Sequence, residues 1–176
     1  GKKFENKIEK PNNIFGKYKK KISKYGLSSA KKNKTIFTWL RAFYVYGEEK
    51  KGLLTELNKS FKKNKKLFLK NPFKYNDFIF VDDVVKCILQ AIKFKKNGIF
   101  NLGTGNKITT LSFCRTFCMI KNINENKIIE YKKSSFSKHG IWASIEKTKK
   151  YLNFRANTVL NKGISKSLKR LNYIKK

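Results

Sequence analysis

The stretch NDFIFVDDV, residues 76–84, holds a strand pattern that runs directly into a helix pattern. The apolar run at 78–81 predicts a short buried strand. We expect Asp82 or Asp83 to cap a helix over 83–94, because a carboxylate at a helix start accepts the backbone N–H groups of the first turn. The apolar residues of that helix fall on one face: Val84, Val85, Ile88, Leu89 and Ile92.

The same alternation of strand and helix patterns continues on both sides of this stretch. Strands are expected at 35–40, 98–102 and 128–131. Residues 1–14 are expected to form a loop, and a polar helix at 16–31 is expected to bury Ile22, Tyr25 and Tyr18. The other expected helices are 52–63, 144–152, 159–172 and one that starts at Thr109 or Thr110 and runs to about Lys121. Alternation of this kind predicts an α/β architecture with a partly parallel sheet.

Length and composition exclude several classes of protein. The chain has 176 residues, which fits one domain or part of a larger one. Its hydrophobic content of 40% and aromatic content of 14% exceed those of a disordered basic tail. No apolar run approaches the roughly 18 residues of a membrane span. Three cysteines without a CxxC pair argue against a disulfide framework or zinc cluster, so a reducing, cytoplasmic setting is expected.

The formal net charge of +32 has two interpretations. It is typical of a basic nucleic-acid-binding domain, since cations neutralise phosphates. Arginine, which reads bases bidentately, is scarce, and lysine is spread from end to end. We therefore favour a compositional bias of the surface, with non-specific polyanion binding expected in either case. The four arginines are Arg41, Arg115, Arg155 and Arg170.

Four motifs in one order carry a resemblance to a known family. They are LRAFYVYG at 40–47, NDFIFVDDV at 76–84, NLGTG at 101–105, and EKTKKYLNF with LNKGI at 146–164. Together they resemble the C-terminal half of the extended short-chain dehydrogenases/reductases, which include the NAD-dependent epimerases and dehydratases of nucleotide sugars. Gly103 and Gly105 lack the third glycine and the strand-to-helix context of a dinucleotide fingerprint.

The resemblance implies a fold and its division. The fold class is α/β: the C-terminal part of a Rossmann-like doubly wound fold plus a small substrate-binding α/β region, with the N-terminal dinucleotide-binding units absent. Residues 1–176 would form a single partial domain. Within it, 1–50 and 78–102 would end the Rossmann-like core, and 51–77 and 103–176 would form the substrate-binding region.

The resemblance also implies a catalytic Tyr-x-x-x-Lys pair at the start of a helix, for which two registers exist. The preferred register places Phe15 at the tyrosine position and Lys19 at the lysine position, with Tyr18 as a neighbour. Phe15 cannot donate a proton. The other register begins at Tyr25 and has lost the lysine, and it leaves a short distance to the strand that contains Arg41.

Further site residues follow from the matched motifs. Lys19, Phe43, Tyr44 and Val45 would bind the cofactor, NAD or NADP. Tyr44, Tyr46 and Asn76 would contact a nucleoside-diphosphate sugar, although Asn76 stands where the family has an arginine that grips the diphosphate. No metal site is expected. A homodimer is one assembly that the resemblance allows.

The function that the resemblance implies is NAD(P)-dependent epimerase, dehydratase or 4-ketoreductase chemistry on a nucleotide sugar. The absent fingerprint and the replaced tyrosine predict a truncated chain that is inactive alone. Two alternatives stay open: a degenerate pseudoenzyme of the same family, and a basic nucleic-acid-binding domain.

Overall fold

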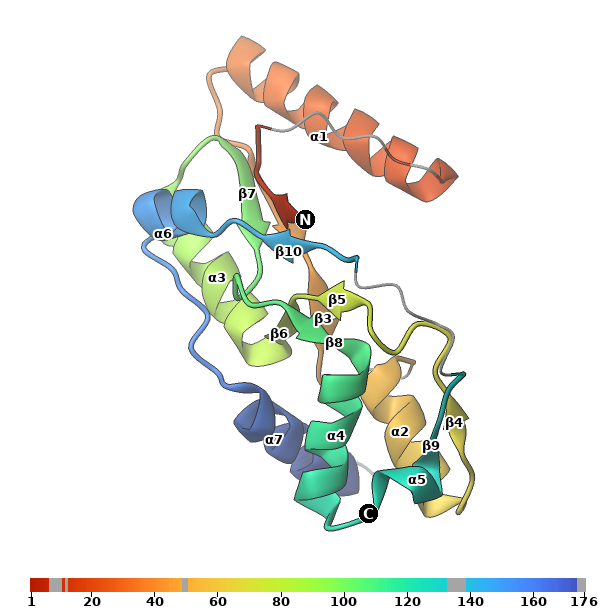
Figure 1. The fold of residues 1–176 in the computed structure, drawn as a ribbon. Coiled ribbons are helices and arrows are strands. Elements are labelled where there is room, and N and C mark those ends of the chain that lie inside the picture. The colour runs from red at the N-terminus through yellow and green to blue at the C-terminus, as the bar shows by residue number, and fades with distance from the viewer. Residues whose placement is uncertain (7–10, 12, 49–50, 133–138, 174–176) are drawn as a thin grey trace.

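Short pairs of strands run through the middle of the molecule, with helices on both sides (Figure 1). The computed structural model describes residues 1–6, 11, 13–48, 51–132 and 139–173. The strands are β1 (Lys2–Lys3), β2 (Thr38–Ala42), β3 (Tyr44–Tyr46), β4 (Leu67–Phe68), β5 (Tyr75–Asn76), β6 (Phe78–Phe80), β7 (Gly98–Leu102), β8 (Ile108–Thr109), β9 (Ile129–Glu130) and β10 (Trp142–Ala143). The helices are α1 (Ile14–Lys32), α2 (Leu53–Lys62), α3 (Val81–Phe94), α4 (Thr110–Lys121), α5 (Glu125–Ile128), α6 (Glu146–Leu152) and α7 (Leu160–Tyr173).

Parallel pairing dominates, as the alternating pattern predicts. β2 pairs with β7 in register from Thr38 opposite Gly98, and β3 pairs with β6 from Tyr44 opposite Phe78. β1 pairs with β10 and β4 with β9, also in parallel, whereas β5 pairs with β8 antiparallel. The strand expected at 35–40 lies at 38–42 instead, because the Thr35 N–H bonds back to the helical carbonyl of Ala30.

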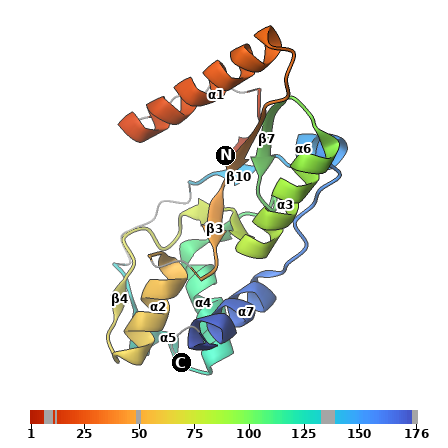
Figure 2. The same cartoon turned by 180° about the vertical axis from the view of Figure 1, so that it is seen from behind.

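β6 lies between two hydrophobic cores. Its side chains alternate across the strand, so Phe78 and Phe80 enter one core and Ile79 enters the other. The first core collects apolar residues of α2, α4 and α7, and the second those of α3, α6 and β7. Seen from behind, α7 packs on α4 at the end of the molecule far from α1 (Figure 2).

The predicted cap of α3 is wrong by two or three positions. The helix begins at Val81, with Phe80 at the N-cap and no capping side chain. Asp82 and Asp83 therefore lie inside the first turn, where their charge favours the helix dipole. Each carboxylate binds a distant group instead: Asp82 accepts from Arg170, and Asp83 accepts from the Thr158 N–H.

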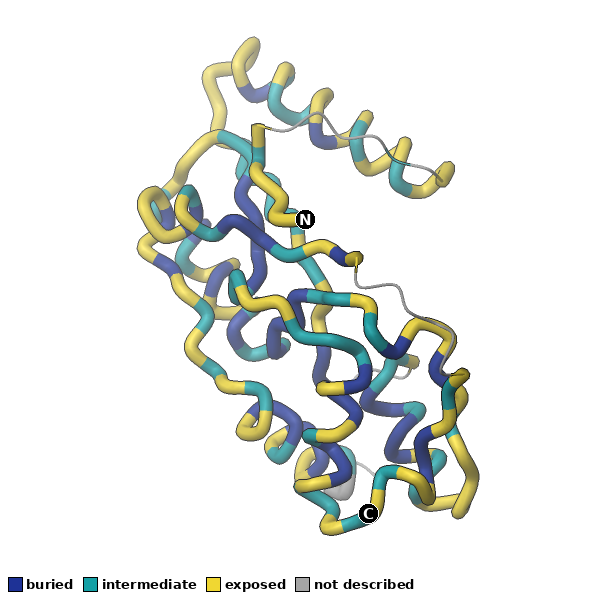
Figure 3. Tube along the Cα trace, viewed as in Figure 1, coloured by how far each residue is buried: buried dark blue, intermediate teal, exposed yellow. Residues whose placement is uncertain are grey.

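α1 and α3 each carry several exposed large apolar residues. Exposed positions recur along both helices in Figure 3, where they are yellow. On α1, the prediction that Ile22, Tyr25 and Tyr18 are buried is wrong, since these side chains are 54–77% exposed. The buried residues of α1 are small, Ser23 and Ala30. On α3, the exposed apolar residues are Val85, Ile88, Leu89 and Ile92, while Asp83, Cys87 and Ala91 are buried. Within the described ranges, no helix combines the length and the hydropathy that crossing a membrane requires.

Candidate functional site

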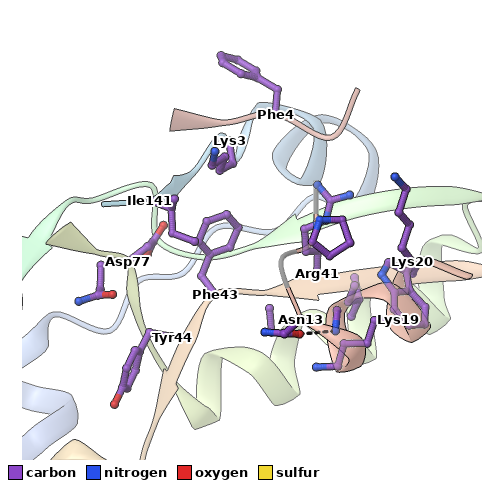
Figure 4. Close-up of a pocket in the computed structure, with 16 residues that line it drawn as sticks. Lys3, Phe4, Asn13, Lys19, Lys20, Arg41, Phe43, Tyr44, Asp77 and Ile141 are labelled. Atoms are coloured by element: carbon purple, nitrogen blue, oxygen red, sulfur yellow. Dashed lines mark hydrogen bonds between the residues drawn. The ribbon is translucent and has the colours of Figure 1, made fainter. Parts of the chain in front are cut away.

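A cavity of about 860 Å³ lies between the first helix and the central strands (Figure 4). Four of the residues predicted for the site line it: Lys19, Phe43, Tyr44 and Asn76. They come from α1, from the β2–β3 junction and from β5, which are far apart in the sequence. The fold therefore brings most of the predicted site residues to one place.

The start of α1 aims its residues at this cavity. Asn13 caps the helix, and its side-chain oxygen accepts the Gly16 N–H at 2.7 Å. Gly16, Lys19 and Lys20 then line the cavity. Phe15 does not line it and is 67% exposed, with the Lys19 Nζ 4.5 Å from the centroid of its ring.

Tyr44 and Asn76 lie between two cavities. Both residues also line a second cavity of about 340 Å³, together with Lys70 and Lys74. The Tyr44 ring packs at a tilt against that of Phe78, with the ring centroids 4.7 Å apart, and the Asn76 side-chain amide donates to the Thr110 hydroxyl at 3.1 Å. These contacts hold both side chains at the wall between the two cavities.

Val45 and Tyr46 lie apart from the large cavity. They line a third cavity of about 470 Å³ with Tyr44 and Gly47. Tyr46 is 1% exposed and packs on Phe80 and Phe113, so its ring belongs to the core. Burial raises the pKa of the Tyr46 hydroxyl, which keeps it neutral. A substrate contact by Tyr46 stays a prediction.

Asp77 is the residue of this region to which the sequence interpretation gave no role. It lines the large cavity yet is 1% exposed, and its carboxylate accepts four hydrogen bonds from two other segments, the Thr104–Gly105 turn and β10. The sequence did contain a signal for this role, because Asp77 is a charged residue between β5 and β6. A charged side chain that is buried between strands needs hydrogen-bond partners.

The cavity is lined by cations. Lys3, Lys19, Lys20 and Arg41 contribute to its wall. Among the lining residues that the structure describes, the one acidic residue is Asp77, whose carboxylate is already hydrogen-bonded. A concave surface with this charge balance favours an anionic ligand.

Neither a metal site nor a reactive thiol is supported by the described part of the chain. No group of three or more His, Cys, Asp or Glu residues there could hold a metal ion. Burial raises the pKa of the Cys87 and Cys114 thiols to about 12, so neither is a reactive thiolate near neutral pH.

Mostly parallel strand pairs with helices on both sides define an α/β fold. The model of the NAD dependent epimerase/dehydratase family matches residues 2–103, so the chain belongs to that family.

Solved structures share the fold. One is a tyrosine-to-phenylalanine mutant of UDP-glucuronic acid 4-epimerase from Bacillus cereus with UDP-4-deoxy-4-fluoro-glucuronic acid and NAD (TM-score 0.85, 21% identity, 99% of this chain and 57% of that one). Another is ADP-L-glycero-D-manno-heptose-6-epimerase from Helicobacter pylori (TM-score 0.81, 26% identity, 98% and 55%). A third is UDP-glucose 4-epimerase from Thermotoga maritima with UDP-glucose (TM-score 0.83, 20% identity, 96% and 56%). The chain thus spans a little over half the length of these structures.

Proposed function

We propose that this chain forms the nucleotide-sugar side of an epimerase- or dehydratase-type site and binds a nucleoside-diphosphate sugar without completing catalysis by itself. The observation that carries the proposal is the gathering of Lys19, Phe43, Tyr44 and Asn76 around one cationic cavity. Solved structures of the same fold hold UDP-sugars, which supports this ligand class.

The chain's own residues fit one end of a nicotinamide cofactor. Lys19 supplies cationic donors for ribose hydroxyls, and Phe43 and Tyr44 supply apolar and aromatic surface for a ring. A Gly-rich strand-to-helix turn for the pyrophosphate is not found among the described residues, since Gly103 and Gly105 lead from β7 to β8. NAD or NADP, when bound, supplies hydride transfer at a sugar carbon.

In the preferred register, which begins at Phe15, the tyrosine position holds no side chain that could donate or accept the proton at the sugar. Phe15 has no hydroxyl, and neither Tyr18 nor Tyr25 lines the large cavity. The α1 residues that do line it are Gly16, Lys19 and Lys20, which supports the register that begins at Phe15. We therefore propose a binding protein of this family rather than an independent catalyst, either as part of a larger enzyme or as a degenerate member.

Three further proposals concern setting and organisation. All three cysteines are buried and free, which supports a reducing, cytoplasmic setting.

The division into core residues 1–50 and 78–102 and substrate-binding residues 51–77 and 103–176 stays a prediction. The exposed apolar side chains of α1 are compatible with a homodimer, because a second copy of the chain would cover them. Sedimentation equilibrium measures whether the protein is a monomer or a dimer.

A second candidate function, nucleic-acid binding, is favoured by the composition of α1. This helix carries seven lysines and no acidic residue. Phosphate binding by lysine is salt-dependent and independent of sequence, whereas binding at the cavity depends on particular side chains. The two candidates can therefore be separated in one set of measurements.

The test is calorimetric titration of the protein with UDP-glucose and, separately, with a DNA duplex of about 20 base pairs at about 50 and 200 mM salt. We expect UDP-glucose binding that Tyr44→Leu weakens about tenfold. The control Tyr151→Leu changes an exposed tyrosine of α6 and should bind normally. Salt-sensitive DNA binding with no UDP-glucose binding would contradict the proposal and support the second candidate.

A further inference from the structure

A buried carboxylate, that of Asp77, lies in the wall of the proposed site. The Asp77 Oδ1 atom accepts from the Thr104 N–H at 2.8 Å and from the Thr104 hydroxyl at 2.6 Å. Its Oδ2 atom accepts from the Gly105 N–H at 2.9 Å and from the Ala143 N–H at 3.0 Å. None of these four donors is a cationic side chain, so the charge of a buried group is stabilised by fixed backbone and hydroxyl dipoles.

These bonds hold together segments that are distant in the sequence. Thr104 and Gly105 form the turn after β7, and Ala143 ends β10 beside Ile141, another residue of the cavity wall. The Asp77 backbone carbonyl accepts the Tyr44 N–H at 3.0 Å, which adds β3 to the set. One residue thus links β3, the turn after β7 and the end of β10.

Gly103 shows how closely this junction is packed. A Cβ atom at Gly103 would lie 2.6 Å from the Asp77 Oδ2 and 2.8 Å from the Ala143 Cβ. Because no larger residue fits there, the carboxylate can approach the backbone of the turn and of β10 at the same time. The junction is therefore closely packed around the Asp77 carboxyl group.

We propose that Asp77 is a positioning residue of the nucleotide-sugar site, which fixes Tyr44 and the neighbouring Asn76 against the Thr104–Gly105 turn and β10. The proposal rests on the proposed function, since it assigns Asp77 a part in binding that ligand. Asp77 itself acts through Tyr44 and Asn76, which form the cavity wall. A merely structural role would lower stability without any selective effect on binding.

The test compares Asp77→Asn with Asp83→Asn. Asp83 is a matched control, because it is also fully buried and accepts a backbone N–H, that of Thr158 at 2.9 Å, yet it does not line the cavity. In Asp77→Asn, an amide N–H₂ would face donors that need an acceptor. Each folded variant is titrated with UDP-glucose by calorimetry, and the Tyr44 amide is followed by ¹⁵N NMR.

We expect Asp77→Asn to weaken UDP-glucose binding at least about tenfold and to shift the Tyr44 amide, while Asp83→Asn does neither. Thr104→Val removes the hydroxyl donor and keeps the other three hydrogen-bond donors to Asp77. This variant tests the positioning role if Asp77→Asn does not fold, and it should weaken UDP-glucose binding about threefold. Wild-type affinity in the Asp77 and Thr104 variants, or an equal loss in Asp83→Asn, overturns the proposal.

The same titrations distinguish a failure of the proposed nucleotide-sugar binding from a failure of the positioning role of Asp77. If the wild-type protein binds no UDP-glucose, the proposed function is wrong, and the binding role of Asp77 falls with it. If the wild type binds and Asp77→Asn binds equally well, only the positioning role is wrong.

Discussion

The Lys19 Nζ lies 4.5 Å from the centroid of the Phe15 ring, one turn away on α1. This is a cation–π contact between the two residues that the preferred register predicts for the family's catalytic pair. In that register, the lysine lies beside a ring that carries no hydroxyl. We therefore propose that the pair has the electrostatic half of the arrangement without the proton donor.

Phe15→Tyr should place a phenol whose pKa is depressed by Lys19. At this separation, with the ring exposed to water, the attraction is worth about 1 kcal/mol, or somewhat under one pKa unit. The measurement is an NMR titration of ¹³Cζ-labelled tyrosine, with Phe15→Tyr/Lys19→Met as the control. A resonance that titrates near pH 10 in both variants would show that Lys19 does not act on this position.

Asn76→Arg should strengthen UDP-glucose binding about tenfold, because charge-assisted hydrogen bonds to a phosphate are stronger than those of a neutral amide. Asn76 sits at the wall between two cavities, within reach of a ligand in either. Asn161→Arg, an exposed position on α7, adds the same charge away from the site. Equal gains in the two variants would mean that only overall charge matters.

Gly163→Ala should lower the free energy of unfolding by about 2 kcal/mol, although alanine normally favours a helix interior over glycine. The reason is contact: an added Cβ would lie 2.1 Å from the Tyr46 hydroxyl and 2.9 Å from its ring carbon. Urea unfolding measures the change, and Lys162→Ala, on the exposed side of α7, should leave the midpoint almost unaltered. A stabilised Gly163→Ala variant would refute this packing of Tyr46 against α7.

Arg170 and Asp82 should make stability depend on pH in acid. Hydrogen bonds from Arg170, at 2.7 and 2.8 Å, lower the pKa of Asp82 in the folded state. The unfolded chain then binds more protons, so this stabilisation is present above the unfolded pKa of about 4 and is lost as pH falls through the folded pKa.

Arg170→Met should therefore flatten the decline of stability between about pH 5 and pH 2. Urea unfolding across this range tests the expectation, and a double variant with Asp82→Asn should show little further change. An unaltered pH dependence in Arg170→Met would exclude this pair as its source.

The order of the elements could be predicted from the sequence because each element carries its own periodicity. The run at 78–81 followed by two aspartates indicated the β6–α3 junction, and Thr109 was among the two residues expected to start α4, which it caps through the Ser112 N–H. Apolar stripes indicate which residues share a face, but not what covers that face. This is why Ile22 and Tyr25 were expected to be buried and are exposed.

Part of the candidate site was accessible from local motifs, and part was not. Lys19, Tyr44 and Asn76 lie in recognisable segments, and the fold brings them to one cavity. The role of Asp77 depends on donors 27 and 66 residues away in the chain. Such partners are mostly backbone N–H groups, which every residue except proline has, so no side-chain pattern identifies them.

The most direct test of the central claim, that these residues form one binding site for a nucleotide sugar, is a ¹⁵N NMR titration of the wild-type protein with UDP-glucose. We expect saturable shifts concentrated at Gly16, Tyr44, Asn76 and Thr110, around the two cavities that Tyr44 and Asn76 share. Shifts spread without saturation over the lysine-rich surface, or no shifts at all, would contradict it.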